Sequence, residues 1–352
     1  MAQTQACWPP TLTTDPEILG YLTDINKINY SRDIGRSFHL GGNIYHQYGD
    51  TFCKNSKGDF VGVVCCTTSK VVDQSKPLQS SYLAIDSNGL VMPLLSLNDE
   101  EIAYQKNNPG NRPTLWAFGG VVEVGNGIGL LWYEKGIDHN PGSGQPQTYE
   151  CLGIGIAKVA IERSSGQPTT ERIPGLLFQQ NEPHFGSAFL DNGYIYLYGQ
   201  ISGDCKIALT RVPPDSATDR SKYQFWNGSG WCTNTSDCAP AYADLPQGQV
   251  LRSSFFGTAY PYLFVGVSKY GDSKIRVGRA KAPEGPWDIY VVGTAKGINY
   301  PNDYMYCIFP HPWAFADKDG KLMVTWSEHW PGGVVAAKLS FKLDAQAAKQ
   351  GL

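Results

Sequence analysis

The sequence predicts an all-β fold, a five-bladed β-propeller that forms one domain with a site in its central channel. The 352 residues include 39 Gly, 23 Pro and 12% aromatic residues but only 17% charged residues, as is typical of many strands joined by tight turns. One hairpin pattern also recurs five times at intervals of about 60 to 85 residues, the period of a propeller blade with loop insertions. A chain of this length can bury a sizeable core.

Each repeat is a turn rich in Gly, Asn or Asp that leads into an alternating apolar strand. The five copies span residues 40–50, 124–135, 190–200, 259–269 and 317–328, and the fourth has Tyr-Pro in place of a glycine turn. A segment of small and aromatic residues precedes each copy, and another β-prone run follows it. Each unit is therefore predicted to supply one blade.

The strand pattern also sets the expected boundaries along the chain. We expect residues 1–30 to form an N-terminal extension that closes the propeller, residues 31–343 the propeller itself, and residues 344–352 a C-terminal tail. Helical periodicity is weak and confined to residues 99–105 and 344–350. The pattern resumes on both sides of segments 106–113, 136–147 and 213–249, which are therefore predicted to be surface loops.

Charge and hydropathy exclude two classes of partner. A net charge of −3 and an isoelectric point near 6.1 argue against electrostatic binding of nucleic acid. No apolar run reaches the roughly 18 residues of a membrane span, so we expect no membrane partner. The expected partner is a small-molecule or oligosaccharide substrate, and the chain is expected to be a monomer.

Cysteine and sequon usage favours a secreted protein. Of the nine cysteines, Cys232 and Cys238 flank a short polar loop and are predicted to form a disulfide. Asn-x-Ser sequons occur at Asn29, Asn227 and Asn234. The N-terminus has neither a basic nor an apolar signal region, so a signal peptide was removed or the protein stays in the cytoplasm with reduced cysteines.

The first strand of each blade lines the channel of a propeller, where backbones crowd together. Gly35, Gly119, Gly186 and Gly257 lie at similar places in four predicted blades, as close approach requires. Polar and aromatic residues near these strands are predicted to bind substrate, although aromatic residues at such positions belong to the core more often than to a binding surface. The predicted binding residues are Arg36, Trp116, Glu182, His184, Arg252, Ser254, Phe256, His311, Trp313 and Trp326.

Two carboxylates are the most specific chemical signal. Asp33 and Asp50 lie in the same predicted blade and are joined by one hairpin, so both can reach one pocket. We predict that they form a catalytic pair, although an aspartate at the end of a strand can also cap a turn.

Other chemistry has little support in the sequence. The glycine-rich segment 125–129 falls in a hairpin and opens no helix, so it is not a phosphate-binding loop. There is no His-Glu-x-x-His motif, and Cys232 and Cys238 lack a second pair of zinc ligands. The sequence has no Gly-x-Ser-x-Gly elbow and no flavin or nicotinamide motif. We therefore expect neither a cofactor nor a metal.

The segment Arg32-Asp33-x-Gly35-x-Ser37, followed by Gly49-Asp50-Thr51, resembles a family of five-bladed propellers long described as a domain of unknown function. Some bacterial members of that family are endo-D-arabinanases. Segments 308–312 and 324–327 are similar to the last blade of the family. The resemblance implies that Asp33 and Asp50 are catalytic carboxylates. Ile34 stands where the family usually has glycine, and Arg36 where it has an aromatic residue.

Three functions stay open at this point. In glycoside hydrolysis, one carboxylic acid protonates the leaving oxygen while the other, ionised group activates water or attacks the anomeric carbon. Arg36 is expected to hold the ionised group charged. A second resemblance, to the fungal hetero-Diels–Alderases of tropolonic sesquiterpene pathways, implies dehydration to a quinone methide followed by cycloaddition. The third function is sugar binding without catalysis.

Overall fold

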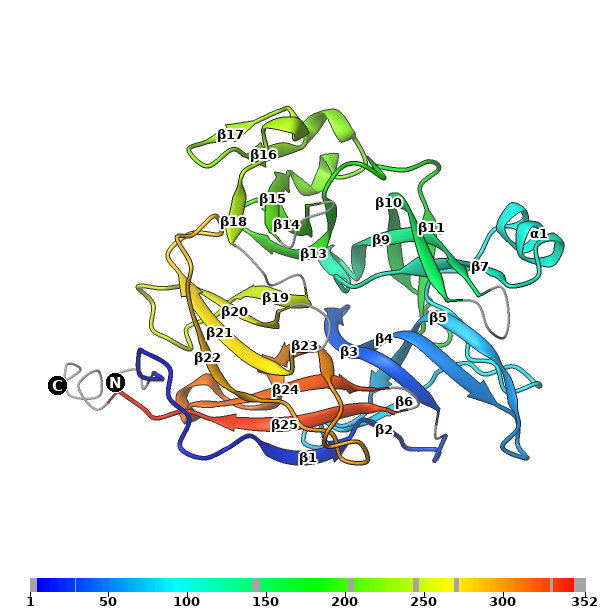
Figure 1. Cartoon of the computed structure of the whole chain (residues 1–352), viewed down its shortest axis with the longest axis horizontal. Helices are drawn as coiled ribbons and strands as arrows, with labels where there is room; N and C mark the ends of the chain where they lie inside the picture. The colour runs from blue at the N-terminus through cyan, green and yellow to red at the C-terminus, as the bar shows by residue number, and fades with distance from the viewer. Residues whose placement is uncertain are drawn as a thin grey trace.

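Five sheets surround a common centre and confirm the predicted five-bladed β-propeller (Figure 1). The computed structural model describes residues 5–28, 30–140, 146–201, 206–242, 247–268, 272–329 and 332–344. Within these ranges the only α-helix is α1 (Asp99–Asn107), which lies on the outside of the second blade (Figure 1). None of the described helices is long and apolar enough to span a membrane.

Each blade is one sheet, numbered here in chain order. Blade 1 contains β2 (Thr23–Asp24), β3 (Ser31–Leu40), β4 (Asn43–Lys54), β5 (Phe60–Val71) and β6 (Gln79–Ser81). Blade 2 contains β7 (Asn111–Trp116), β8 (Val122–Gly125), β9 (Ile128–His139), β10 (Thr148–Ile161), β11 (Pro168–Arg172) and β12 (Phe178–Gln179). Blade 3 contains β13 (His184–Asp191), β14 (Tyr194–Gln200), β15 (Ile207–Val212), β16 (Gln224–Trp226), β17 (Trp231–Cys232) and β18 (Pro240–Tyr242).

The last two blades are simpler. Blade 4 contains β19 (Gln247–Arg252), β20 (Tyr262–Val267), β21 (Lys274–Ala280) and β22 (Asp288–Thr294). Blade 5 contains β23 (Met305–His311), β24 (Lys321–Glu328), β25 (Val334–Ser340) and, on its outer edge, β1 (Glu17–Tyr21), which pairs with β25. Short 3₁₀ turns lie at Pro214–Ser216, Arg220–Lys222, Thr235–Asp237, Pro312–Ala314 and Asp317–Asp319.

The five sequence repeats supply the second strand of each blade, namely β4, β9, β14, β20 and β24. The first strands contact one another around the ring, in the order β3, β8, β13, β19 and β23 and back to β3. Gly119 shows why small residues are needed there, because a Cβ on it would lie 1.5 Å from the carbonyl oxygen of Gly186 in the next blade. The predicted crowding of backbones at the channel is confirmed at this pair.

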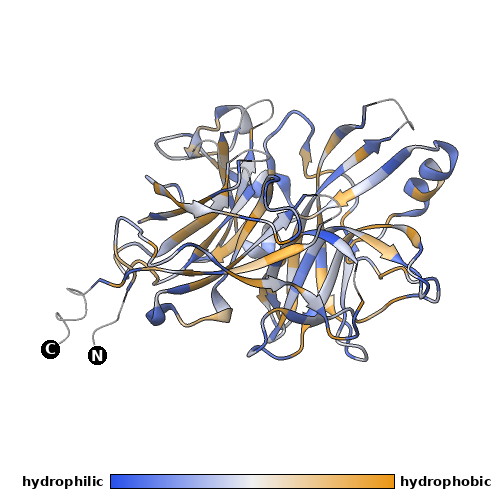
Figure 2. Cartoon of the chain, turned by 60° about the horizontal axis from the view of Figure 1, so that its bottom comes forward, coloured by the Kyte–Doolittle hydropathy of each residue, from blue (hydrophilic) through white to orange (hydrophobic). Residues whose placement is uncertain are grey.

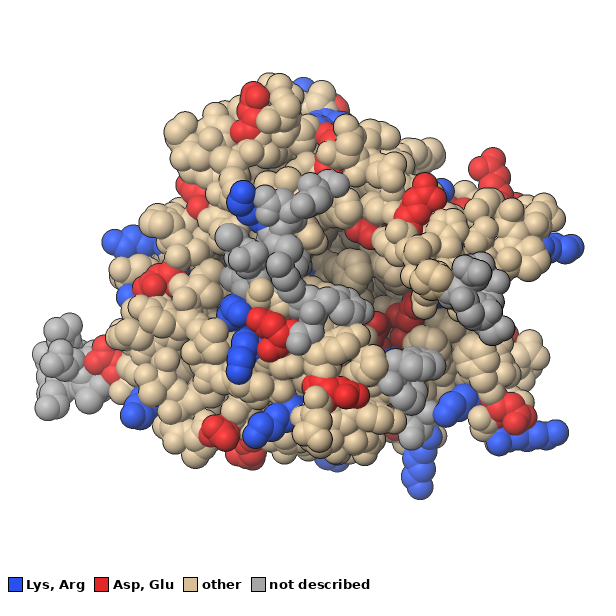
Figure 3. Space-filling view, viewed as in Figure 1, with Lys and Arg blue, Asp and Glu red and all other residues tan. Residues whose placement is uncertain are grey.

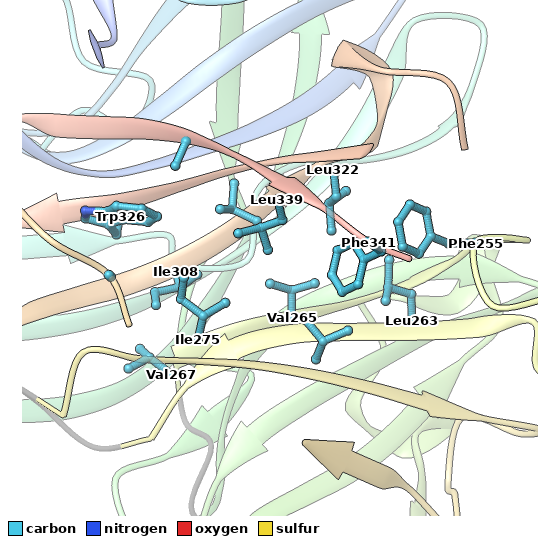
Figure 4. Close-up of a cluster of buried hydrophobic side chains, with 14 of the residues drawn as sticks. Phe255, Leu263, Val265, Val267, Ile275, Ile308, Leu322, Trp326, Leu339 and Phe341 are labelled. Atoms are coloured by element: carbon cyan, nitrogen blue, oxygen red, sulfur yellow. The ribbon is translucent and has the colours of Figure 1, made fainter. Parts of the chain in front are cut away.

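Apolar residues gather along the strands, whereas the outer loops and α1 are hydrophilic (Figure 2). The largest apolar cluster joins blades 4 and 5 (Figure 4), and it includes Leu263, Val265, Ile275, Ile308 and Trp326. Similar clusters join the other blades, so the core is a ring of interfaces rather than one central mass.

All three predicted loops contain strand residues. Segment 213–249 includes β16, β17 and β18, which extend blade 3 outward, and the start of β19. Segment 106–113 includes the start of β7, and segment 136–147 includes the end of β9. The helix expected at residues 99–105 is present as α1, where Asn98 and Glu101 form a reciprocal capping box. The helix expected at residues 344–350 lies outside the described residues, except for Asp344.

The predicted disulfide between Cys232 and Cys238 is wrong, because both residues are free cysteines. The Cys232 thiol instead donates to the carbonyl oxygens of Phe225 and Asn234, at 3.3 and 3.5 Å. The remaining cysteines in the described ranges are also free.

Candidate functional site

Asp33 lies where strand β3 departs from regular pairing. The register between β3 and β4 shifts on both sides of Ile34, and a bulge of this kind changes the direction of the neighbouring side chains. Ile34 adopts φ +70° and Gly35 adopts φ +71°. The left-handed region costs a residue with a Cβ roughly 1–2 kcal/mol, and burial of the Ile34 side chain against Cys307 and Phe309 offsets this cost. Backbone strain is thus stored directly beside Asp33.

The Asp33 carboxyl is half-buried and accepts hydrogen bonds from two neutral donors. The backbone N–H of Asp50 donates to Oδ1 at 3.0 Å, and the Tyr306 hydroxyl donates to Oδ2 at 3.1 Å. Desolvation by the surrounding protein and the nearby charge of Asp50 raise the pKa of Asp33 to about 7. At neutral pH this carboxyl is therefore poised to carry and release a proton.

Asp50 has the opposite environment. Arg112 donates to both of its carboxylate oxygens, at 2.6 and 3.2 Å, and the indole N–H of Trp116 donates to Oδ1 at 3.1 Å. Arg112 also binds Asp138 at 3.1 Å, and the Cys65 thiol donates to Asp50 at 3.1 Å. Asp50 therefore lies in a two-point guanidinium–carboxylate pair, which fixes its orientation.

A polar cavity of about 710 Å³ opens beside Asp50, between blades 1 and 2. Seven of its eleven lining residues carry carboxylate, amide or guanidinium groups, and Phe52, Val63 and Pro109 add apolar surface. The lining includes Asp50, Phe52, Gln105, Asn111, Arg112, Asp138, Asn140 and Gln147. Hydroxyl-rich ligands bind to walls of this composition.

A second cavity, of about 580 Å³, occupies the centre of the propeller, and the face drawn in Figure 3 is hollowed near its middle. Its wall is largely aromatic and includes Trp116, Phe118, Trp132, Tyr149, Phe185 and Phe309. Trp116 belongs to both environments, because it stacks on Tyr149 with ring centroids 4.5 Å apart while its N–H binds Asp50. The apolar cavity therefore lies one indole ring away from the carboxylate pair.

His184 is the predicted residue that faces the central cavity together with Trp116. Its Nδ1 lies 3.0 Å from Oε2 of Glu134, and the Cys151 thiol is adjacent. Hydrogen bonding to Cys151 and Glu134 raises the pKa of His184 to about 10. Glu134, Cys151 and His184 are a group in the described residues that could hold a metal ion.

Arg36 does not pair with either aspartate, contrary to the sequence prediction. Its guanidinium is buried and donates to the carbonyl oxygen of Phe118 at 2.9 Å and to Ser187 Oγ at 3.3 Å. Burial lowers the pKa of Arg36 to about 9. Because Phe118 and Ser187 line the central cavity, Arg36 supports the wall of that cavity from behind.

Three other predicted polar residues lie away from both cavities. Glu182 accepts hydrogen bonds from Arg220 at 2.6 Å and Thr235 at 2.7 Å on the outside of blade 3. Arg252 is more than half exposed and pairs with Asp191. Ser254 donates to Asp317 at 3.2 Å between blades 4 and 5. Each is held by a partner at the periphery, so the structure does not bring these three residues into the channel.

The remaining predicted residues are structural; three of them are buried and Trp313 is partly buried. Phe256 and Trp326 belong to the apolar cluster of blades 4 and 5, and the Trp326 indole donates to the Lys296 carbonyl at 3.0 Å. His311 is buried, with Ser37 Oγ and Thr325 Oγ1 each 2.8 Å from one of its ring nitrogens. Trp313 donates to the same Ser37 oxygen at 2.9 Å. These contacts are structural, and none of the four side chains lines either cavity.

The sequence reasoning missed several side chains that build the site. Arg112 and Asp138 lie in segments that were expected to be surface loops, and Cys151 lies in a strand that contains no recognisable motif. No sequence pattern therefore indicated these three residues. Glu134 had a usable signal, because it lies two residues after the buried Trp132 in the second repeat. Strict alternation places both side chains on the same face of β9.

Comparisons with known proteins agree with this architecture. The model of a family described as "Domain of unknown function (DUF4185)" matches residues 160–335, which run from the end of β10 into blade 5. Asp33 and Asp50 precede the matched segment. No curated protein matches the chain.

Solved structures similar to the chain are propellers of low sequence identity. A protein of Bacteroides ovatus, provisionally described as a hydrolase, is 17% identical with a TM-score of 0.58, over 93% of this chain and 87% of that one. A GH43_1 enzyme of Xanthomonas citri complexed with xylose is 11% identical with a TM-score of 0.51, over 92% and 91% of the two chains. A GH43 β-1,3-galactosidase with galactodeoxynojirimycin is 10% identical with a TM-score of 0.52, over 94% and 96%. These likenesses support the fold.

Proposed function

We propose that this chain, which belongs to the DUF4185 family, is a glycoside hydrolase that cleaves a furanoside bond of an arabinan-like substrate, with Asp33 and Asp50 as its two carboxyl groups. The observation that carries the proposal is the contrast between the two groups. Asp33 has neutral hydrogen-bond donors and a pKa raised to about 7, whereas Asp50 is bound at both oxygens by Arg112. Glycoside cleavage needs two neighbouring carboxyl groups in different protonation states.

The contrast supports a different role for each residue in this proposal. Protonated Asp33 donates its proton to the glycosidic oxygen, so that the leaving sugar departs as an alcohol. Ionised Asp50 either takes a proton from an attacking water or attacks the anomeric carbon itself. Arg112 and the Trp116 N–H hold the Asp50 carboxylate in place for either step.

The cavity beside Asp50 supports a sugar as the substrate. Amide and carboxylate groups such as Asn111, Gln147 and Asp138 can exchange hydrogen bonds with sugar hydroxyls, and Phe52 offers an apolar surface for a sugar ring. The solved GH43 structures that share the fold were crystallised with xylose and with galactodeoxynojirimycin, which is compatible with a sugar substrate. The furanoside preference rests on the resemblance of the Asp33 and Asp50 segments to endo-D-arabinanases.

The test is a panel of arabinans and furanoside oligosaccharides incubated with the purified protein and analysed by mass spectrometry. We expect new, shorter oligosaccharides that disappear in both Asp33→Asn and Asp50→Asn. Asp317→Asn is the matched control, because Asp317 binds Ser253 and Ser254 away from both cavities and its loss should leave turnover intact. Turnover that persists in both active-site variants, or no product across the panel, would overturn the hydrolase proposal.

A second candidate function is supported by the aromatic central cavity. Asp33 does not itself line this cavity. In this reaction Asp33 would protonate a hydroxyl group that leaves as water, the ring hydroxyl of the substrate would lose its proton, and the resulting quinone methide would add to an alkene in a hetero-Diels–Alder reaction. Walls such as Trp116, Phe118 and Phe309 suit planar apolar reactants better than sugars. Orientation of the two reactants would supply much of the rate.

The two candidates differ in their need for Asp50. Hydrolysis requires an ionised second carboxylate, whereas cycloaddition requires only the acid. Incubation with a hydroxymethyl-tropolone and an alkene should therefore give an adduct that survives Asp50→Asn but is lost in Asp33→Asn. Saturable sugar binding without any product would instead indicate a sugar-binding propeller.

A further inference from the structure

One wall of the central cavity carries three side chains that neither proposed reaction uses. Glu134 comes from β9, Cys151 from β10 and His184 from β13, so the group bridges blades 2 and 3. Their ligating atoms all lie within 4.8 Å of one another. We propose that Glu134, Cys151 and His184 bind a divalent transition-metal ion, and that Zn²⁺ is the ion their chemistry selects.

The mutual distances distinguish a metal site from a catalytic relay. In a nucleophile–imidazole–carboxylate relay the ring separates the two outer atoms, which then lie about 6 Å or more apart. Ligands of tetrahedral zinc face one point and lie about 3.3–3.8 Å apart, given metal–ligand bonds near 2.0–2.3 Å. The Cys151 sulfur and the Glu134 carboxylate lie within 4.8 Å of each other, which places the three atoms around a common centre.

The Nδ1 atom of His184 is the ring nitrogen that faces the cluster, because it lies 3.0 Å from Oε2 of Glu134. Neutral imidazole binds metal ions through either ring nitrogen, and the two nitrogens point in diverging directions. Nδ1 is therefore the atom that would bind the ion, whereas the buried Nε2 does not contribute to the site.

The donor set identifies the ion. Thiolate and imidazole together favour zinc over calcium or magnesium, which prefer oxygen ligands. Three protein ligands leave a fourth tetrahedral position, as in catalytic rather than structural zinc sites. Since all three residues line the central cavity, that position opens into it and can take a water molecule or an oxygen atom of a ligand.

Neighbouring contacts connect this cluster to the carboxylate pair. The Tyr149 hydroxyl is hydrogen bonded to Glu134, and its ring stacks on Trp116, whose N–H binds Asp50. A partner that orients a ligating carboxylate is a regular feature of metal sites. The ion would therefore sit in the apolar cavity, connected to Asp50 through the stacked rings of Tyr149 and Trp116.

Cobalt titration tests the proposal without any substrate. Co²⁺ added to the metal-free protein should bind at one ion per chain and give tetrahedral d–d absorption together with a thiolate-to-cobalt band. Cys151→Ser should abolish the thiolate band. His184→Gln should weaken binding by at least about 100-fold, the upper range for loss of even an outer partner. Cys232→Ser is the matched control, because it removes another partly buried thiol that lies at the periphery of blade 3 and should leave the spectrum unchanged.

A second measurement needs no variant. Zn²⁺ should protect Cys151 from alkylation in the unaltered protein, as read by mass spectrometry of the peptide that contains it. Any of four results would overturn the proposal. The protein could bind less than one ion per chain, or alkylation of Cys151 could be equal with and without Zn²⁺. The thiolate band could survive in Cys151→Ser, or it could vanish in Cys232→Ser. Both experiments measure metal binding and not turnover. A negative result in the hydrolase assay would therefore not affect this test.

Discussion

The junction of blades 1 and 2 and the junction of blades 4 and 5 are built from the same hairpin repeat but are held together differently. Blades 4 and 5 meet through buried aliphatic and aromatic side chains such as Leu263, Ile308 and Trp326 (Figure 4). Where blades 1 and 2 meet beside the polar cavity, Arg112 links Asp50 of one blade to Asp138 of the other. We therefore expect catalysis at the charged junction of blades 1 and 2. The apolar junction of blades 4 and 5 is expected to contribute to rigidity.

The largest expected effect is at the charged junction. Arg112→Leu should lower the free energy of unfolding by about 3–5 kcal/mol, because it leaves two partly buried carboxylates without their cation. It should also abolish hydrolysis, since Asp50 loses the guanidinium that binds both of its oxygens and holds them in place. Urea unfolding measures the loss of stability, and the panel of arabinans and furanoside oligosaccharides measures the loss of hydrolysis.

Arg112→Lys provides the control for this prediction. A lysine keeps the positive charge but cannot donate to both Asp50 oxygens in the planar, two-point arrangement. It should recover part of the stability and little of the activity. If Arg112→Leu were as stable as the parent protein, the charged junction would not contribute to folding as described.

The next effect is a pH dependence that originates at Asp33. Its pKa is about 7 in the folded protein, against 3.8 for the ordinary group, so between these values the folded state holds a proton that the unfolded chain has lost. This group therefore reduces stability as pH rises from about 4 to about 7, with a slope of up to about 1.4 kcal/mol per pH unit. Chemical denaturation at a series of pH values measures the slope.

The comparison with Asp33→Asn isolates this contribution. Burial lowers the pKa of His46 to about 4 and that of His311 well below its usual value, so both histidines have the opposite effect and reduce stability as pH falls below about 6.5. Their effect is common to both proteins and cancels in the difference. Equal slopes in the parent and Asp33→Asn would mean that the Asp33 pKa is not raised.

Much of the architecture could be predicted from local patterns. A glycine or asparagine turn followed by apolar alternation encodes a hairpin within about a dozen residues, and five such hairpins determine the number of blades. The segment that carries β16, β17 and β18 was missed, because its short strands are separated by turns and 3₁₀ segments and show no alternation. Periodicity cannot identify strands of two or three residues.

The site was predictable only in part, because its partners come from different blades. Asp33 and Asp50 meet because one hairpin joins them, and the sequence shows that hairpin. Arg112 reaches Asp50 only through the packing of two blades, which no local pattern encodes. Trp116 and Trp326 look alike in the sequence, yet one binds Asp50 and the other is buried in the apolar cluster.

A smaller effect is expected at the apolar junction. Ile275→Val removes one methyl group from a fully buried side chain and should cost about 0.5–1.5 kcal/mol in the free energy of unfolding. Turnover per folded molecule should stay unchanged, because Ile275 lines neither cavity. Thermal unfolding measures the change in stability, and the panel of arabinans and furanoside oligosaccharides measures turnover. A loss of activity without a loss of stability would show that the two junctions are not as separate as we describe.

The smallest expected effect is at Arg252. Like Arg112, it forms an ion pair with an aspartate. Its side chain is 57% exposed, whereas that of Arg112 is 22% exposed, so water and salt screen its interaction with Asp191. Asp191 also keeps a hydrogen bond from the Tyr262 hydroxyl at 2.6 Å when the arginine is removed. Arg252→Ala should therefore unfold at the same denaturant concentration as the parent protein, at low and at high salt. A destabilisation comparable to that of Arg112→Leu would show that exposure does not separate the two pairs, and that the charge of the first junction has no special role.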